Sequence, residues 1–393
     1  MIPEIRKKII SEFTDVRYRA FVDELNTTYK YPTDFRSAET PIFLTRDVKR
    51  QLVEACDVIV AQLQTHEFTI HASTAIPEGL SVPNESDHPT FLQIDFAICK
   101  DNHGKFSPRL IELQGFPSLY GYQAFLNDTI RKHFSIPPGY GASFNGFVRE
   151  TYERLLRDVI VGDSDPKNVI LLEIEPEQQK TRIDFAVMEK MLGIRTVCLT
   201  KIKRHGKRLF YNDNGKEIPI ERIYNRVIFD ELQRKNIRSE FNFTDEIDAH
   251  WVGHPNWYFR ISKHTLPFLK SRYVPECYTV NDLQMYPADL QNYVLKPLYS
   301  FAGLGVDINV TAQKLDALTD KTQFLLQRKV NYADLIETPD GFAKAEVRMM
   351  FIWKDRPILV KNLVRLSKGA MMGVDFNKNK TWVGSTIAYH EAV

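Results

Sequence analysis

Lys296 stands beside a glycine-bearing turn, an arrangement suited to binding phosphate. It closes an apolar stretch, and Gly303 and Gly305 lie in the turn that follows, before a second apolar stretch starts at Val306. A lysine fixed on a strand neutralises phosphate oxygens, while a glycine backbone approaches closely and donates N–H groups. The spacing matches neither the P-loop nor the dinucleotide-binding fingerprint. From this segment alone, a phosphate-binding site and an ordinary glycine-containing hairpin are therefore equally good interpretations.

The strands predicted after this turn carry further polar groups. An apolar strand over residues 324–330 contains Gln327, Arg328 and Lys329. A long hairpin follows, with arms at 345–353 and 358–369. Because strand side chains alternate with a period of two, one side of the second arm collects four residues, Lys361, Leu363, Arg365 and Ser367.

An acidic hairpin is predicted much earlier in the chain. Apolar strands at 91–98 and 109–115 flank an Asp-Asn-His-Gly turn. Glu112 and Gln114 are two residues apart and face the same side. Asp95 lies in an otherwise apolar strand, where a carboxylate is unfavourable without a charged partner. The alternative is that these are half-exposed polar positions on an edge hairpin, since antiparallel sheets often face water on one side.

The order of these segments resembles that of a circularly permuted ATP-grasp enzyme. The similar family is that of the eukaryotic-type glutathione synthetases, with glutathionylspermidine synthetase-like proteins as relatives. Short segments carry the resemblance from about residue 90 to the C-terminus, namely 94–96, 111–114, 223–226, 294–297, 326–330, 363–368 and 369–374. The resemblance implies a mixed α+β and α/β fold in which two subdomains hold ATP between them.

The resemblance also implies roles for individual residues. The catalytic positions would be Arg348, Arg365 and Lys368. The ATP-binding positions would be Lys296, Ser300, Gly303, Gly305, Gln327, Arg328 and Lys329. The Mg²⁺ ligands would be Asp95, Glu112 and Gln114. The substrate-binding positions would be Arg226 and Ser118.

Two departures from the family pattern and two local alternatives stay open. Gln114 stands where the family has asparagine, and Ser300 lies near the position of an acidic metal ligand. Arg226 pairs with a substrate carboxylate in one interpretation and with Glu221 or Asp230 in the other. Ser118 has an ordinary alternative role as the N-cap of a helix predicted over 119–133.

The implied activity is that of an ATP-dependent carboxylate–amine ligase acting on small molecules through an acylphosphate. Mg²⁺ prefers oxygen ligands and bridges phosphates with one or two carboxylates. Phosphoryl transfer depends mostly on positioning and charge neutralisation, which lysine and arginine supply. Two alternatives use the same scaffold: a kinase-like transfer without an amine, and a nucleotide-binding protein without catalysis.

Three regions are predicted along the chain. Residues 1–162 combine N-terminal helices with the acidic hairpin, and residues 241–393 form the nucleotide-binding lobe. Between them, residues 163–240 form an inserted substrate lobe. A β-α-β pattern within this lobe runs over 168–174, 185–192 and 195–199.

Composition limits the class of protein further. The chain has 393 residues, of which 43% are hydrophobic and 26% charged, as in ordinary globular proteins. A net charge of +2 demands neither nucleic acid nor an anionic membrane as partner. The basic run at 201–208 is interpreted as a solvated hairpin turn. Four scattered cysteines without CxxC spacing, and no apolar run of transmembrane length, favour a cytoplasmic protein; a homodimer is left open.

Overall fold

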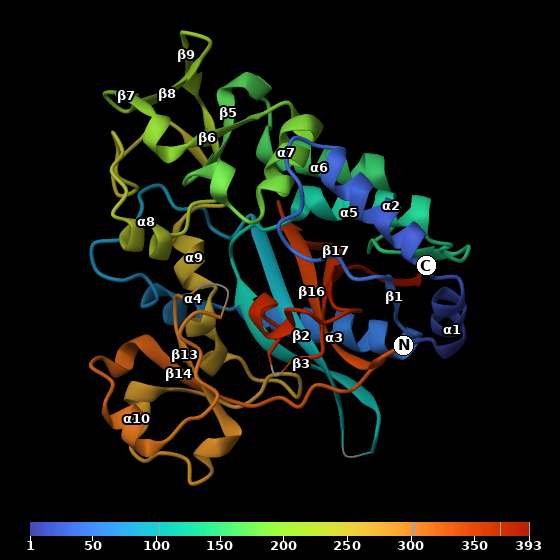
Figure 1. The fold of residues 1–393 in the computed structure, drawn as a ribbon. Coiled ribbons are helices and arrows are strands. Elements are labelled where there is room, and N and C mark those ends of the chain that lie inside the picture. The colour runs from blue at the N-terminus through green and yellow to red at the C-terminus, as the bar shows by residue number, and fades with distance from the viewer. Residues whose placement is uncertain (102, 301–302, 370, 393) are drawn as a thin grey trace.

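The computed structural model describes residues 1–101, 103–300, 303–369 and 371–392. The fold is mixed α+β with several sheets (Figure 1). A long central sheet occupies the middle of the view, a parallel sheet lies above it, and a small antiparallel sheet lies at the lower left. Among the described helices, none is long and apolar enough to cross a membrane.

The central sheet joins the two hairpins that the sequence predicts far apart. Its strands are, in spatial order, β18 (Gly384–Thr386), β17 (Pro357–Ser367), β16 (Gly341–Trp353), β2 (Phe91–Lys100) and β3 (Phe106–Gln114), with β15 (Ile336–Thr338) paired to β16. All of these pairings are antiparallel, and β16 pairs with β2. Both predicted hairpins are thereby confirmed. The predicted regions 1–162 and 241–393 share this one sheet, while their boundaries stay predictions.

The two faces of the central sheet differ in chemistry. Ile94, Phe96, Val347 and Met349 lie on an apolar face and pack in one buried cluster with residues of the helix α3 (Arg46–Leu63). Apolar residues of α3 recur at helical spacing on the side that faces this cluster, and Thr45 caps the first turn of the helix. Directly opposed residues of antiparallel strands point to the same face. The pairs Asp95–Arg348, Asp95–Glu112 and Glu346–Arg365 therefore project together from the other face.

The parallel sheet contains the predicted β-α-β unit, which is confirmed. Its order is β11 (His250–Val252), β10 (Arg222–Asn225), β5 (Val169–Glu173) and β6 (Arg195–Cys198), with α7 (Arg182–Leu192) connecting β5 to β6. Every residue of β5 is buried, as expected for a strand covered on both faces. The helices α5 (Tyr120–His133) and α6 (Arg149–Ile160) pack in one buried cluster with α7. The same cluster includes residues of the central strands β16 and β17.

The small sheet carries the lysine–glycine segment. Its central strand β14 (Phe324–Arg328) lies between β12 (Cys277–Thr279) and β13 (Tyr293–Pro297). The helix α10 (Ala312–Asp316) covers it with a compact apolar core. The 3-10 segment η4 (Lys263–Phe268) precedes β12 and contacts both β12 and β3. The small sheet is therefore fastened against the acidic hairpin.

The remaining described elements are the N-terminal helices, three short helices and two further small sheets. The N-terminal helices are α1 (Pro3–Ser11) and α2 (Asp15–Thr27), and the short sheet beside them is β1 (Ile42–Phe43), β19 (Ala388–Glu391) and β4 (Tyr140–Gly141). The other helices are α4 (His66–Ser73), α8 (Phe229–Lys235) and α9 (Asn256–Arg260). A separate meander comprises β7 (Lys203–His205), β8 (Arg208–Asp213) and β9 (Lys216–Ile220). Its basic residues pair with local acids, namely Lys203 with Glu240, Arg204 with Asp245 and Lys207 with Glu246.

Candidate functional site

A row of buried ion pairs occupies the polar face of the central sheet. Arg348 donates from Nε to Asp95 Oδ1 at 2.6 Å and from Nη2 to Asp95 Oδ2 at 2.7 Å. Arg365 donates to Asp95 Oδ2 at 3.1 Å and also pairs with Glu346. Burial opposes the charge of Arg365, but Glu346, Asp95 and Glu112 outweigh it and raise its pKa. Both carboxylates are thus held in place by the two arginines.

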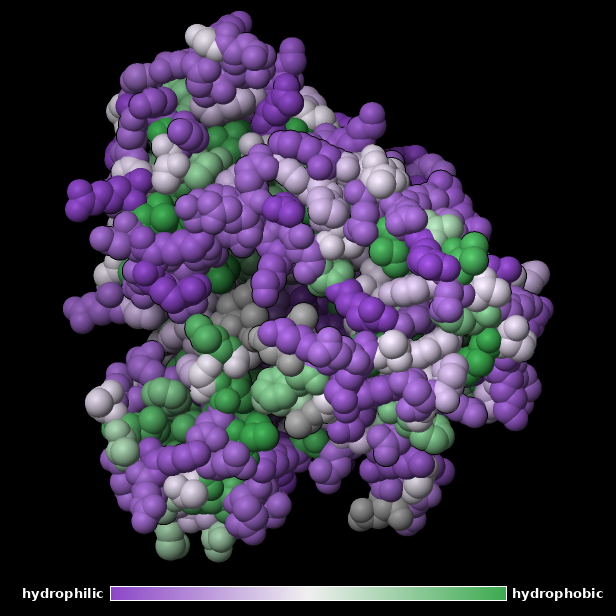
Figure 2. Space-filling model, viewed as in Figure 1, coloured by the Kyte–Doolittle hydropathy of each residue, from purple (hydrophilic) through white to green (hydrophobic). Residues whose placement is uncertain are grey.

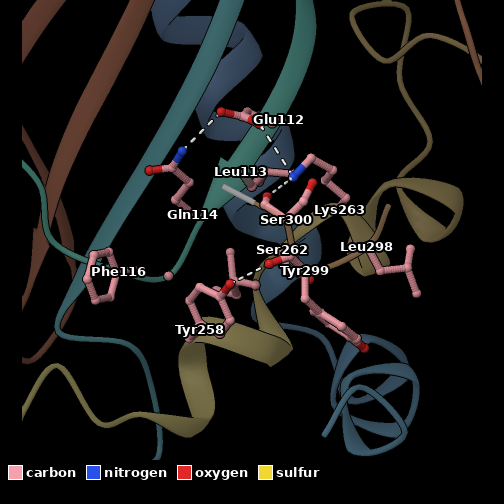
Figure 3. Close-up of a pocket in the computed structure, with 12 residues that line it drawn as sticks. Glu112, Leu113, Gln114, Phe116, Tyr258, Ser262, Lys263, Leu298, Tyr299 and Ser300 are labelled. Atoms are coloured by element: carbon pink, nitrogen blue, oxygen red, sulfur yellow. Dashed lines mark hydrogen bonds and ion pairs between the residues drawn. The ribbon is translucent and has the colours of Figure 1, made fainter. Parts of the chain in front are cut away.

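Glu112 lies at the end of this row and faces cations from two directions. Its Oε1 accepts a hydrogen bond from Gln114 Nε2 at 3.0 Å, and its Oε2 lies 4.0 Å from Lys263 Nζ (Figure 3). Burial alone would raise the pKa of Glu112, but Lys263, Arg365, Lys296 and Arg348 together bring it below the usual range. Glu112 is therefore an ionised carboxylate at neutral pH.

The lysine side of the site is built by the small sheet and η4. Lys296 Nζ donates to the carbonyl oxygen of Ile111 at 3.1 Å and also to Gln327 Oε1. Gln327 Nε2 in turn donates to the carbonyl oxygen of Leu110 at 3.2 Å, so both side chains attach to β3. Burial lowers the pKa of Lys296, and Glu112 acts in the opposite direction. Lys296 therefore lies against the acidic hairpin, although 185 residues separate it from Ile111 in the chain.

A narrow pocket opens between Glu112 and the loop after β13 (Figure 3). Lys263, which is only 7% exposed, points across it and donates from Nζ to the carbonyl oxygen of Ser300 at 2.6 Å. Gln114, Phe116 and Tyr258 line the pocket from the other elements. Hydrophilic residues also gather around a hollow near the middle of this face of the molecule (Figure 2). The pocket is polar at the Glu112 end and aromatic at the other.

A second and larger cavity, of about 500 Å³, lies on the arginine side of the row. Arg348 and Arg365 belong to its lining, and the other walls come from Leu363, Leu366 and Met372, from residues 377–381 and 383–385, and from residues 35–36 and Leu119. Glu112 therefore stands between a lysine-lined pocket and an arginine-lined cavity.

Three predicted site cations make their contacts elsewhere. Lys368 pairs with Asp340, which lies in the turn between β15 and β16. Arg328 pairs with Glu276 at 3.2 Å and Asp289 at 3.1 Å. Lys329 Nζ donates to the carbonyl oxygen of Gln291 at 2.6 Å. A contact of these three side chains with a ligand stays a prediction and would require that these bonds be exchanged.

The glycine turn has the backbone conformation that the sequence suggests. Gly303 and Gly305 have φ values of 76° and 74°, in the left-handed region that favours glycine. A Cβ atom on Gly305 would lie 2.9 Å from Pro297 Cγ, so this glycine also permits a close approach. The turn returns to β13 through paired backbone bonds between Leu295 and Asp307, each 2.9 Å long. Residues 301–302 of the same turn lie outside the described part.

The prediction that Ser118 caps the following helix is wrong. The helix α5 begins at Tyr120, and its N-cap is Leu119, which has φ 62° and makes no side-chain capping bond. Asp184 of α7 instead accepts the backbone N–H of Tyr122 at 2.8 Å. Ser118 uses its carbonyl oxygen to accept a bond from Gln93 Nε2 at 2.8 Å. A carboxylate from another helix thus replaces the local hydroxyl.

Arg226 is buried at the end of β10 with part of its hydrogen-bonding capacity unused. Its guanidinium lies 4.9 Å from the ring of Phe116 and 5.6 Å from that of Phe185. Nε and Nη1 bond to no described residue. Among the described contacts, Arg226 pairs with neither of the two predicted local partners: Glu221 accepts from Asn168, and Asp230 pairs with Arg234.

Glu173 lies near Arg226 because both stand at the carboxyl ends of neighbouring parallel strands. The chain leaves β5 toward β6 on one side, while β10 lies on the other, so this is the point where strand order reverses. Ligands of open parallel sheets bind at such points. Burial raises the pKa of Glu173 to about 8, although Arg226 opposes that shift. The two residues form a second polar centre.

Sequence reasoning did not assign three of these residues to the site. Glu346 shares the strand period of Arg348, so alternation could have placed it on the same face. Glu173 ends a continuously apolar strand, which is a usable signal of a buried carboxylate. Lys263 carries no local signal of burial, because it is enclosed only when η4 packs against β3.

Side-chain oxygen atoms of the acidic hairpin could bind Mg²⁺. Gln114 Oε1 is buried and accepts no bond from a described residue, and it stands beside ionised Glu112. These two groups fit a magnesium ion that takes its other ligands from phosphate and water. Asp95 is a predicted ligand whose two oxygens are engaged by arginines in this structure. Among the described residues, no three His, Cys, Asp or Glu side chains converge on one point.

Comparison with known proteins places the fold but assigns no family. No protein-family model matches the chain, and no curated protein matches it. Among solved structures, the chain is similar to a glutathione synthetase-like effector, GSS30, from Globodera pallida in its apo form. The TM-score is 0.57 at 9% sequence identity, over 99% of this chain and 98% of the other. The chain therefore has a mixed α+β fold like that of a glutathione synthetase-like protein.

Proposed function

We propose that this protein is an ATP-dependent carboxylate–amine ligase built on a circularly permuted ATP-grasp fold. One observation carries the proposal: Lys263 and Lys296 reach the Glu112 strand from the small-sheet side, while Arg348 and Arg365 project from the same face of the central sheet as Glu112. The likeness to a glutathione synthetase-like effector supports the same class of fold. Two pairs of cations around one carboxylate suit a reaction between two anions, here ATP and a carboxylate substrate.

The lysines would hold the nucleotide. Lys296 and Lys263 reach the same edge of β3 from the small sheet and from η4. Both ammonium groups donate to backbone carbonyl oxygens, Lys296 to that of Ile111 and Lys263 to that of Ser300. Phosphate oxygens are stronger acceptors than these carbonyls, because they carry a negative charge that attracts the ammonium group and the carbonyl oxygens are neutral. The lysines would therefore exchange a carbonyl for a phosphate when the nucleotide enters.

The arginines would hold the carboxylate substrate. In the proposed reaction, a carboxylate oxygen attacks the γ-phosphorus of ATP, the bond from that phosphorus to the β–γ bridging oxygen breaks, and ADP leaves. The amine nitrogen then attacks the acyl carbon, the acyl C–O bond breaks, and one amine proton ends on the departing phosphate. Arg348 and Arg365 orient the attacking group, since Asp95 and Glu346 fix both guanidinium planes.

Magnesium, when bound at Glu112 and Gln114, would neutralise the phosphate charge that develops during transfer. Glu112 suits this role because its pKa is lowered and its charge is present at neutral pH. Gln114 orients Glu112 through the bond between Nε2 and Oε1. Arg226 and Glu173 would bind a part of the substrate remote from the reacting carboxylate.

A second function is favoured by one observation. Ser300 stands near the position at which the family resemblance implies an acidic metal ligand, and its backbone carbonyl is held by Lys263. A site with fewer carboxylates binds its metal more weakly, which favours a nucleotide-binding protein without catalysis.

Trapping with hydroxylamine tests the proposal. The full-length protein is incubated with Mg-ATP and a panel of carboxylates, and hydroxamate and ADP are measured together. Equal amounts of both products, formed without an amine, are expected from a ligase. Glu112→Gln should abolish both, while Glu78→Gln, on the exposed surface, should not. ADP or phosphorylated products without hydroxamate would favour the kinase-like function, and nucleotide binding without ADP would favour the binding protein.

A further inference from the structure

The arginine-lined cavity is unusual in combining donors with apolar walls. Its volume of about 500 Å³ is within the usual range for small-molecule sites. The apolar part of the lining comes from six residues: Phe35, Leu119, Leu363, Leu366, Met372 and Val383. The cationic part comes from Arg36, Arg348, Arg365, Lys378 and Lys380. Among the described residues that line it, none is acidic.

The arginines have donors that no described residue accepts, although both side chains are ion-paired. Arg348 uses Nε and Nη2 for Asp95, and Arg365 uses Nη2 for both of its carboxylates. Arg348 Nη1 and Arg365 Nε and Nη1 bond to no described residue. None of these three nitrogen atoms is among the fully buried polar atoms that lack a hydrogen-bond partner. The carboxylate partners thus fix each guanidinium plane while leaving donors accessible from the cavity.

The outer wall of the cavity is fastened to the N-terminal segment. Ser385 N–H donates to the carbonyl oxygen of Arg36 at 2.8 Å, and Ala38 N–H donates to that of Ser385 at 2.9 Å. Gly384 has φ 120°, and a Cβ atom there would collide with the carbonyl oxygen of Arg36. Glycine at this position is therefore needed for the close approach that holds the wall in place.

We propose that this cavity binds the carboxylate substrate of the ligase, and that it selects an organic acid with an apolar body. The inference rests on the proposed function for its catalytic meaning. The carboxylate lies against Arg348 and Arg365, next to Glu112, and the apolar body extends between Leu363 and Met372. A small polar acid leaves these walls in contact with water, so it binds less tightly than an acid that covers them.

Calorimetry on the nucleotide-free, full-length protein tests this inference with matched probes. Hexanoate is compared with hexanamide, which has the same body without the charge, and with acetate, which has the charge without the body. We expect hexanoate to bind at least tenfold more tightly than either. Equal binding of hexanamide, equal binding of acetate, or no binding of hexanoate would overturn the inference.

Two variants locate the binding in this cavity. Met372→Trp fills the space beside the apolar walls and should weaken hexanoate at least tenfold, whereas Met285→Trp, at an 84% exposed position, should not. Arg365→Gln should reduce the preference for hexanoate over hexanamide; an unchanged preference would exclude Arg365. Tight binding of hexanoate without hydroxamate formation would contradict the ligase activity but support the acid-binding cavity. Hydroxamate formation that Met372→Trp leaves unaffected would contradict binding in this cavity but support the ligase activity.

Discussion

Asp95 and Arg348 are 253 residues apart in the chain and form a two-bond ion pair across the neighbouring strands β2 and β16. Asp95 is 1% exposed and Arg348 is 8% exposed, so both charges are largely withdrawn from solvent. The pair therefore joins the acidic hairpin to the arginine hairpin at the point where the candidate site is assembled.

Because of this ion pair, the stability of each of the two strands depends on the presence of the other. Desolvation of both ions is unfavourable, and their attraction compensates for it only when both partners are present. Arg365 of β17 also donates hydrogen bonds to Asp95 and to Glu346, so the stability of β17 depends on the same cluster. Folding of the site and folding of the central sheet are consequently one process.

Asp95→Asn should destabilise the protein strongly, because it leaves Arg348 buried with an uncompensated charge. Removing one partner of a buried ion pair typically lowers the free energy of unfolding by about 3–5 kcal/mol. Arg365 keeps Glu346, so the loss should fall on the Arg348 contact. Urea unfolding followed by circular dichroism measures the change.

Asp316→Asn is the matched control for this variant. Its pair with Lys321 is 3.7 Å long and exposed, so the free energy of unfolding should be unchanged within error. Equal stabilities for Asp95→Asn and Asp316→Asn would contradict the idea that the buried pair holds the two hairpins together.

Lys296→Met should weaken ATP binding, because it removes a donor to phosphate while keeping an apolar stem. Hydrogen bonds to charged groups contribute about 1.5–3 kcal/mol, so the dissociation constant should rise by roughly ten- to a hundredfold. Calorimetric titration with a non-hydrolysable ATP analogue measures it. Lys270→Met, a substitution of an exposed lysine in the adjoining segment, should bind the analogue normally. A folded Lys296→Met protein with unaltered affinity would exclude this lysine from the nucleotide site.

The strands of the site could be predicted because their pattern is local. Alternation and the turn at 101–104 are sufficient to predict the β2–β3 hairpin, and the same reasoning places Arg365 with Leu363 and Lys361 on one side of β17. The pairing of β2 with β16 depends instead on contacts between distant segments. It became predictable only through segment order, supported by the unfavourable placement of Asp95 in an apolar strand.

Side-chain partners were harder to predict than strands. Lys368 and Arg328 have the residue type that phosphate binding requires, but nearby acids, Asp340 and Glu276, compete for them in the folded chain. Lys263 shows the opposite case, since only packing of η4 on β3 buries it. A single sequence gives the residue type, but the available partner is decided by tertiary contacts.

Glu173 should make stability depend on pH in one direction. Burial raises the folded pKa to about 8 from an ordinary value of 4.5, so the folded state binds more protons between these values. Stability from this group is thus present below pH 4.5 and is lost as the pH rises to about 8. Glu173→Gln cannot ionise, and it should flatten the fall in the urea midpoint between pH 5 and pH 8. A parallel fall in both proteins would show that other groups cause it, and Glu78→Gln, at an exposed position, serves as the control.

Gln114 gives the sharpest test of the metal site, because its side chain has two separable parts. Nε2 orients Glu112, and Oε1 is buried without a described partner. Gln114→Leu removes both and should raise the Mg²⁺ concentration that half-saturates ADP formation by about tenfold, which corresponds to 1.4 kcal/mol. Gln114→Glu keeps an oxygen at the position and adds a charge that the surrounding lysines and arginines compensate, so it should lower that concentration. If Leu and Glu at this position shift the Mg²⁺ dependence equally, the amide oxygen is no ligand, and Glu112 acts through its contacts with the lysines alone.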